Sequence, residues 1–343
     1  MNFKKLSKSF SEIQYRELAI PSYSLMSDYE RNGIRALFKQ RDEETDSLLF
    51  GSAVDCLLTE GREMFESKFA CTEVKISGKQ KEIIDVIAEY HIDDKSESID
   101  DTTIDDWDKA FCQTQFYPNR SYKSKFSMFL NDEGKIKEEY AEYYRLKQMS
   151  RTKKILNKEM YDDVLRTVNE LKYNKLTGPY FSDSIEGSIE KYYQLKFVET
   201  INNRQYKCMV DLLIVDHENK RIIPIDLKTT SKEEYEFPES FLQWRYDIQA
   251  RLYYRLINCA VLHSKEFCNY TVENYRFIVI NKKNLTPLIW IFPQTKEIGN
   301  LINNNTVYRD PIEIGEEIYR ILESGRQLPE NISTDKPNIL KLF

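Results

Sequence analysis

Apolar and polar positions follow a helical period through about the first 60 residues of this chain and again over residues 157–174. The pattern predicts a helix over 26–40 and a second, more apolar helix over 48–61. An amphipathic helix, capped by Asn157, is predicted over 157–174. Residues 62–155 have the least regular pattern. The first half of the chain is therefore expected to be mainly helical.

From residue 190 the period changes to two, which indicates strands. The predicted strands cover 190–199, 205–216, 221–230, 275–280 and 287–292. A tight turn is expected at 217–220, a long helix over about 240–257, and a last helix beginning at Asp310-Pro311. This order predicts an α/β fold, with a mixed central sheet flanked by helices and a helical N-terminal elaboration.

Composition excludes several classes of protein. Apolar residues make up 41% and charged residues 31%, so a sizeable core is expected. No two of the 10 glycines lie within five positions of each other, which excludes the clustered glycines of dinucleotide- and nucleoside-triphosphate-binding loops. The three histidines lack the spacing of a zinc-protease helix, and no Cys-x-x-Cys pair suggests a zinc or redox site. We therefore expect neither a nucleotide cofactor nor an iron–sulfur cluster.

Charge and hydropathy bear on partners and location. The formal net charge of −6 argues mildly against a protein that coats nucleic acid non-specifically, although it allows a local basic groove. No apolar run approaches the about 18 residues of a membrane helix, and the start lacks the apolar core of a secretory signal. We expect a cytoplasmic protein with no membrane partner.

The second and third predicted strands carry the strongest chemical signal. Asp211 interrupts an apolar strand, while Asp226 and Lys228 alternate with Leu227 and so share one face. A symmetric turn at 217–220 would place Asp211 opposite Asp226, with Cβ atoms about 4.5–5.5 Å apart. Two like charges so placed suggest a bridging divalent cation, and oxygen-only ligands favour Mg²⁺ or Mn²⁺.

Lys228 could orient or help deprotonate a water, or stabilise charge on a phosphate. An exposed charged hairpin, or a simple Asp–Lys ion pair on the sheet, is the alternative interpretation. On the following helix, Gln249 and Tyr253 are four residues apart and share a face.

These residues resemble the PD-(D/E)xK nuclease superfamily. The matching pieces are V-D at 210–211, D-L-K at 226–228, and Q-A-R-L-Y at 249–253 for the Q-x-x-x-Y motif of the RecB-like branch. FGSAVDCLLTE at 50–60 resembles the F-G-x-A-x-H-x-L-L-x-E segment of exonuclease VIII (RecE-like) phage and prophage exonucleases, and Glu190 matches an acidic residue that precedes the motif aspartate there.

The resemblance implies a restriction-endonuclease-like core and a Mg²⁺-dependent exodeoxyribonuclease that hydrolyses linear double-stranded DNA, 5′ to 3′, in recombination or phage DNA processing. It implies DNA ends, a single-strand annealing (RecT-like) protein and further copies of the chain as partners. It divides the chain into a helical N-terminal part (1–74), a variable insertion (75–155) and a nuclease core (156–343), together expected to form one compact unit. A replication or defence endonuclease, or a catalytically drifted nucleic-acid-binding module, is the alternative.

The resemblance also assigns roles to individual residues. The implied metal ligands are Asp55, Glu190, Asp211, Asp226 and the backbone carbonyl of Leu227. The implied catalytic residues are Asp211, Asp226, Lys228, Gln249 and Tyr253. Asp55 departs from the family, which has a metal-binding histidine there. An aspartate would favour harder cations over Mn²⁺, or could mean that this outer site has drifted.

Two groups of cations are candidates for DNA binding. Arg31 and Arg35 are four residues apart on the first predicted helix and could hold a terminal 5′-phosphate, although a solvated helix face is the simpler explanation. Arg120, Lys123 and Lys125 alternate with aromatic residues and could clamp a separated strand. The alternative is a loop that packs its own aromatic rings.

Overall fold

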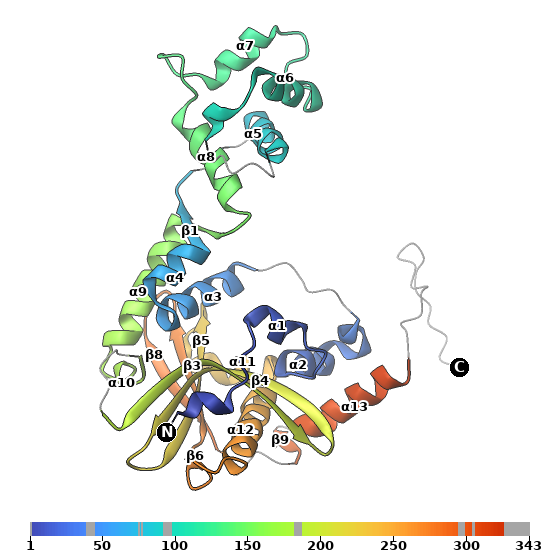
Figure 1. Cartoon of the computed structure of the whole chain (residues 1–343), viewed down its shortest axis with the longest axis vertical. Coiled ribbons are helices and arrows are strands. Elements are labelled where there is room, and N and C mark those ends of the chain that lie inside the picture. Colours follow the sequence, from blue (N-terminus) through green and yellow to red (C-terminus); the bar gives the residue numbers. More distant parts are fainter. Residues whose placement is uncertain are drawn as a thin grey trace. The chain divides into compact units, whose positions relative to one another are not determined.

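The computed structural model describes residues 2–38, 45–74, 76, 78–91, 98–181, 187–293, 299–303 and 306–325. The chain forms two compact units (Figure 1): the first consists of Met1–Thr45 and Asn169–Phe343, and the second of Asp46–Val168. The second unit is thus an insertion into the first. These boundaries differ from those expected at 74 and 155, because the apolar segment around Asp55 folds with the inserted residues.

The first unit is built on a mixed sheet with the strand order β3-β4-β5-β7-β8, in which β6 pairs with β5. The strands are β3 (Ile189–Ile201), β4 (Arg204–Asp216), β5 (Arg221–Thr230), β6 (Thr271–Val272), β7 (Tyr275–Asn281) and β8 (Pro287–Phe292). β3, β4 and β5 are antiparallel neighbours, whereas β5 and β7 run parallel. The predicted mixed sheet is confirmed, and its five predicted strands agree with the observed ones to within two residues at each end, whereas the short β6 was not predicted.

Helices pack around this sheet. They are α1 (Glu12–Glu17), α2 (Tyr23–Asn32), α10 (Gly178–Phe181), α11 (Phe237–Gln243), α12 (Tyr246–Leu262) and α13 (Pro311–Glu323), with short 3₁₀ turns η1 (Phe3–Leu6), η2 (Gly33–Leu37) and η5 (Glu234–Glu236). α12 connects the parallel strands β5 and β7 and packs against β3, β4 and β7. Its residues Ile248, Leu252 and Leu256, spaced one turn apart, are fully buried.

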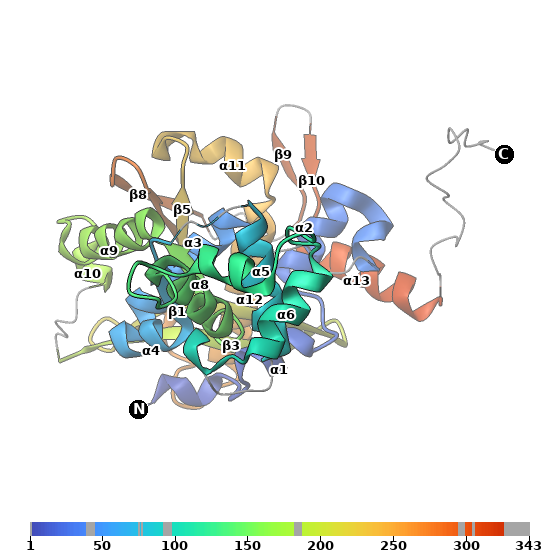
Figure 2. The same cartoon turned by 90° about the horizontal axis from the view of Figure 1, so that it is seen from above.

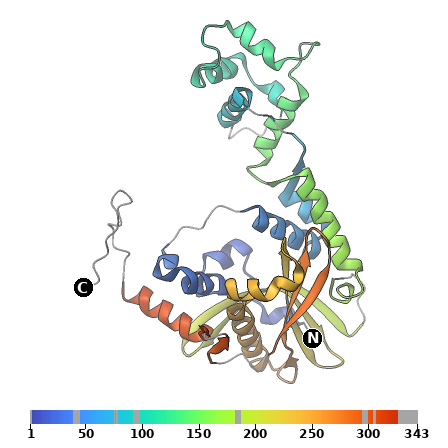
Figure 3. The ribbon, with the colours of Figure 1, turned by 180° about the vertical axis from the view of Figure 1, so that it is seen from behind.

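Figure 3 shows α12 lying along the sheet with α13 beside it. α13 begins at the predicted place, where the Asp310 side chain accepts a hydrogen bond from the Ile312 amide at 2.8 Å. A separate hairpin, β9 (Leu301–Asn303) and β10 (Thr306–Tyr308), precedes it (Figure 2).

Two predicted helices are shorter than expected. α2 ends at Asn32 because Gly33 adopts a φ of 69°, which stops a right-handed helix. The single helix expected over 240–257 is two helices, α11 and α12. The break lies at Arg245, whose φ of 54° and ψ of 43° are left-handed.

The second unit is mainly helical. Its elements are α3 (Asp46–Thr59), α4 (Gly61–Lys68), β1 (Phe69–Thr72), α5 (Gly78–Tyr90), η3 (Ile99–Asp101), α6 (Ile104–Gln113), α7 (Tyr122–Phe126), η4 (Ser127–Phe129), α8 (Glu138–Met149), β2 (Lys154–Asn157) and α9 (Lys158–Tyr173), the last of which continues past Val168. An aromatic core around Trp107, Phe111 and Phe129 fills its helical part. Asn157 caps α9 as predicted, since its side chain accepts from the Met160 amide at 2.8 Å.

Among the described residues, no helix is long and apolar enough to cross a membrane.

Candidate functional site

Strand β5 brings Asp226 and Lys228 together. Strand alternation places both side chains on one face, and the Lys228 ammonium lies 2.6 Å from Asp226 Oδ2. Asp226 is only 1% exposed, whereas the Lys228 side chain is 22% exposed. The pair therefore joins a buried carboxylate to a lysine whose side chain is only partly exposed.

Asp211 lies beside this pair on β4. The predicted register is present, with Leu212 opposite Ile225 and Asp216 opposite Arg221. The regular pairing ends at Leu212, and at the next position Asp211 Oδ2 accepts a hydrogen bond from the backbone amide of Leu227 at 3.1 Å. A side-chain oxygen thus takes the place of a backbone carbonyl between the two strands.

The alternation of β4 is broken at the same point. Core-facing residues occupy even positions before Asp211 (Cys208, Val210) and odd positions after it (Leu213, Val215). On β3, Gln194 lies between the residues that pair with Leu212 and Val210, and has a φ of 52°. Such local irregularities re-aim side chains, and they are frequent beside active sites.

Helix α12 supplies the third side of the site. The Gln249 side-chain amide donates a hydrogen bond to Asp226 Oδ1, and Gln249 is 4% exposed. Tyr253, one turn later, is buried with its ring 6.1 Å from that of Tyr275. Burial raises the pKa of the Tyr253 hydroxyl well above its usual range, and the nearby charges of Asp226 and Asp211 contribute, so this group stays protonated.

Lys228 lies in a strongly negative environment. Burial by itself would lower the pKa of its ammonium, but attraction to Asp226, and to smaller degrees Tyr246, Tyr23 and Asp211, outweighs burial and raises that pKa above its usual range. The ammonium also lies 4.7 Å from the centre of the Tyr246 ring. In this arrangement Lys228 is a fixed positive charge rather than a base.

A small pocket of about 100 Å³ opens beside Lys228. Its lining combines the end of β5 and the residue before η5 with residues of α11, the start of α12 and β7: Lys228, Thr229, Thr230, Glu233, Phe237, Ser240, Trp244, Tyr246 and Val279. Sequence reasoning missed Tyr246 and Trp244 as site residues, because the unbroken helix predicted there gave no reason for either side chain to face a pocket.

The oxygen donors of the site suit a hard divalent cation. Asp211 and Asp226 offer carboxylates from adjacent strands, and the part of the chain that the structure describes has no group of three or more His, Cys, Asp or Glu side chains able to hold a metal ion. Mg²⁺ is commonly held by one or two carboxylates while water and substrate phosphates fill its other positions. Two carboxylates and the Leu227 backbone carbonyl therefore suit Mg²⁺, because it can take its remaining ligands from water and phosphate. They are too few for an ion that takes all its ligands from the protein.

Glu190, predicted as a further ligand, lies away from these residues. It pairs with Val215 on β4, which is four residues and therefore roughly 13 Å along the strand from Asp211. Its carboxylate accepts from the Tyr192 hydroxyl and lies 3.0 Å from Nε2 of His217. The chain thus separates Glu190 from the Asp211–Asp226 pair, because the strand pairing fixes its position near the β4–β5 turn.

Asp55 and one of the two cation groups belong to the second unit. Asp55 lies half-buried on α3, and its part in the metal site stays a prediction. The Lys125 ammonium lies 5.0 Å from the Phe111 ring centre and the Arg120 guanidinium 4.7 Å from that of Tyr117, whereas Lys123 is exposed. Lys125 is 7% exposed, so this segment packs against its own aromatic rings, and a DNA-binding role for it stays a prediction.

The other cation group belongs to the first unit. Arg31 on α2 places its guanidinium 4.6 Å from the centre of the Trp244 ring, and also lies 3.6 Å from Asp28. Arg35 is exposed on η2. Arg31 is therefore next to a residue that lines the pocket beside Lys228.

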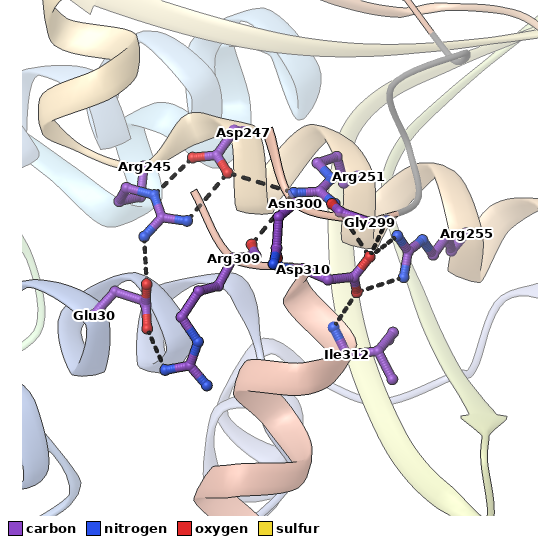
Figure 4. Close-up of polar contacts among 10 residues, drawn as sticks. All are labelled: Glu30, Arg245, Asp247, Arg251, Arg255, Gly299, Asn300, Arg309, Asp310 and Ile312. Atoms are coloured by element: carbon purple, nitrogen blue, oxygen red, sulfur yellow. Dashed lines mark hydrogen bonds and ion pairs between the residues drawn. The ribbon is translucent and has the colours of Figure 1, made fainter. Parts of the chain in front are cut away.

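A buried network of ion pairs supports the start of α12 (Figure 4). Arg245 lies 2.6 Å from Glu30 of α2 and 2.9 Å from Asp247, and is 7% exposed. Further along α12, Arg251 and Arg255 bind Asp310 at 3.1 and 2.6 Å. The network thereby joins α2, α12 and the start of α13.

Comparisons with known proteins give little guidance. No protein-family model and no curated protein matches the chain. Among solved structures, a candidate exonuclease from Eubacterium rectale is 12% identical, with 95% of this chain and 97% of that chain covered and a TM-score of 0.42. The protein SSO0001 is 12% identical over 50% of this chain and 66% of its own, with a TM-score of 0.25. These values are too low to assign an activity.

Proposed function

We propose that this chain is a Mg²⁺-dependent exodeoxyribonuclease that hydrolyses phosphodiester bonds of linear double-stranded DNA. The observation that supports it most is the contact of the buried Asp226 carboxylate with Lys228 and Gln249, beside Asp211 on the adjacent strand. If Asp226 and Lys228 formed only a structural ion pair, there would be no reason for a second carboxylate, Asp211, at the point where the pairing of β4 with β5 ends. The combination is suited to phosphoryl chemistry, which needs a cation site and a fixed positive charge.

Asp211, Asp226 and the Leu227 carbonyl would hold the metal ion. When bound, Mg²⁺ (or Mn²⁺) polarises the scissile phosphate and lowers the pKa of a water molecule. The chain's own residues prepare the site. Gln249 fixes the orientation of the Asp226 carboxylate, and Lys228 offers a positive charge to the oxygens of the substrate phosphate, where negative charge builds up during hydrolysis.

The finer details of the proposal rest on the sequence resemblance to RecE-like exonucleases. They are 5′-to-3′ polarity, a role in recombination or phage DNA processing, assembly into a homo-oligomer, and cooperation with a single-strand annealing (RecT-like) protein. Within this proposal Tyr253 would support Gln249 from the next turn of α12.

Digestion of 5′-labelled linear duplex, with a covalently closed circle as the second substrate, tests this function. We expect the chain to degrade the linear duplex only when Mg²⁺ or Mn²⁺ is present and to leave the circle intact. Asp226→Asn and Lys228→Ala should each reduce the rate at least about 100-fold, because each removes a charge that acts on the reacting phosphate. Circular dichroism should show that both variants remain folded.

Lys265→Ala is the matched control, because it removes an exposed lysine on the loop after α12. It should digest DNA at the unmodified rate. Wild-type-like digestion by Asp226→Asn would remove the proposed site. Cleavage of the closed circle would instead indicate an endonuclease, and a chain that binds no Mg²⁺ or Mn²⁺ in calorimetry would indicate a nucleic-acid-binding protein without catalysis.

A further inference from the structure

The connection between α11 and α12 exposes a large aromatic ring beside the candidate active site. Trp244 is 41% exposed, although it lies one helical turn before the fully buried Ile248. A continuous helix would direct both side chains toward the core. The left-handed Arg245 interrupts the helix between them, and this interruption lets Trp244 face outward.

Helix α2 fixes the position of this connection. The backbone carbonyl of Trp244 accepts hydrogen bonds from the Tyr23 hydroxyl at 2.9 Å and the Ser27 hydroxyl at 2.8 Å. One turn later, Glu30 pairs with Arg245 (Figure 4). Including the stacking of Arg31 on the Trp244 ring, four contacts from one face of α2 therefore fix the position of Trp244 and its neighbour Arg245.

Trp244 contacts a cation and is one of the residues that line the pocket. The Arg31 guanidinium lies over the ring, 4.6 Å from its centre. Trp244 also lines the pocket of about 100 Å³ that contains Lys228 and Tyr246. A planar group stacked on Trp244 would thus lie next to the pocket that Lys228 also lines.

We propose that Trp244, supported by Arg31, is a stacking platform for a nucleobase of a substrate strand that is locally unpaired. Aromatic side chains bind single strands of any sequence in this way, because every base has a π-face. In a duplex that face is covered by the neighbouring bases, so a base can stack on Trp244 only after it has left the base stack. The inference rests on the proposed nuclease function and specifies its substrate as a strand whose base next to the cleaved phosphate is unstacked, as at a frayed end.

Fluorescence can test this, since the chain has only three tryptophans and Trp107 is 2% exposed. The probe is an oligothymidylate of about eight nucleotides, added in Mg²⁺ to the full chain carrying Asp226→Asn, so that it is not cleaved. We expect binding to quench the emission of Trp244 and the quenching to disappear in the same chain with Trp244→Phe. A blunt duplex of equal length should bind more weakly than the single strand.

Affinity separates stacking from general charge attraction. Trp244→Ala should weaken oligothymidylate binding about tenfold, whereas Trp244→Phe, which keeps a ring, should stay within about threefold of the parent. Tyr235→Ala is the matched control, because Tyr235 is 65% exposed and does not line the pocket. It should bind as the parent does. Equal affinity of the Trp244→Ala variant and the parent would overturn the proposal.

The same variants distinguish this inference from the proposed function. If the otherwise unmodified chain digests linear DNA and Trp244→Ala leaves its KM unchanged, the stacking site is wrong and the nuclease function stands. If the chain digests nothing but its binding of oligothymidylate depends on Trp244, the stacking site stands and the nuclease function is wrong.

Discussion

At the scale of single residues, buried charges in the first unit are held by specific polar partners, some of them distant in the sequence. Lys207 on β4 is 5% exposed, and its ammonium donates to the carbonyl oxygens of Tyr15 and Leu18, each at 2.7 Å. Asp226 relies in the same way on Lys228 and Gln249. An unpaired buried charge would cost several kcal/mol, so these contacts determine where each side chain lies.

Asp216 permits a prediction about pH. Its carboxylate accepts from the Asn219 backbone amide at 2.9 Å and from the Arg221 guanidinium at 2.8 Å. Burial acts to raise the pKa of this carboxyl, but these donors outweigh burial and lower the pKa from 3.8 to about 2. Because the folded-state pKa is depressed, the carboxylate stabilises the folded chain above about pH 4, and this contribution is lost as the pH falls from 4 towards 2.

We therefore expect Asp216→Asn to lower the free energy of unfolding by about 2 kcal/mol at pH 7, and by clearly less at pH 3. Urea denaturation at the two pH values measures both. Glu218→Gln, which changes an exposed carboxylate in the same turn, should have little effect at either pH. An Asp216→Asn effect of equal size at pH 7 and pH 3 would contradict the assignment.

At the scale of elements, the break between α11 and α12 shapes the site more than any single strand does. It turns one predicted helix into two, and it places Tyr246 over Lys228 and Trp244 outside the core. A residue other than glycine is strained in the left-handed backbone conformation, so surrounding contacts must stabilise that conformation at Arg245. The ion pairs of Arg245 with Glu30 and Asp247 provide that restraint.

Arg245→Gly tests this restraint. Glycine adopts the left-handed conformation without strain, so the variant isolates the loss of the buried ion pairs. We expect the free energy of unfolding to fall by about 3 kcal/mol, because Glu30 and Asp247 keep their buried charges without this partner. Arg204→Ala, which breaks the more exposed pair with Glu323, should cost no more than about 1 kcal/mol. Similar losses in the two variants would show that the network is not what stabilises this connection.

At the scale of the whole molecule, the first unit is assembled from segments on both sides of an insertion. Its core combines Phe3 and Met26, which precede the second unit, with residues of the sheet, α12 and α13, which follow it. The second unit contains an aromatic core of its own. The first unit can therefore form only if the chain that leaves it after Thr45 returns to it at Asn169.

Gly315 of α13 lies where three of these segments meet. An added Cβ would collide with the Tyr206 ring of β4 and lie 2.9 Å from Met26 Cε of α2. Gly315→Ala should therefore lower the free energy of unfolding by about 1–3 kcal/mol, although alanine is the better helix former by about 1 kcal/mol. Denaturant titration provides the measurement. Gly187→Ala, where the added carbon meets open space, should change stability by less than about 0.5 kcal/mol, and a stabilised Gly315→Ala would refute the close packing.

The sequence by itself determined the local features of this protein. The period-two pattern predicted β3, β4 and β5, and a symmetric turn at 217–220 predicted the register between β4 and β5, because a slip of one residue would turn every side chain to the other face. That register and the alternation of β5 identified Asp211, Asp226 and Lys228 as neighbours, whereas Gln249 was added by the resemblance to the Q-x-x-x-Y motif.

Only the tertiary structure decided the rest. The bend at Arg245 depends on Glu30, more than 200 residues earlier in the chain, and no local pattern records such a contact. The same holds for Glu190, which strand pairing places near His217 instead of Asp211, and for Asp55, which folds with the inserted unit. Periodicity reports which side of an element is buried, whereas packing between distant segments decides which residues meet.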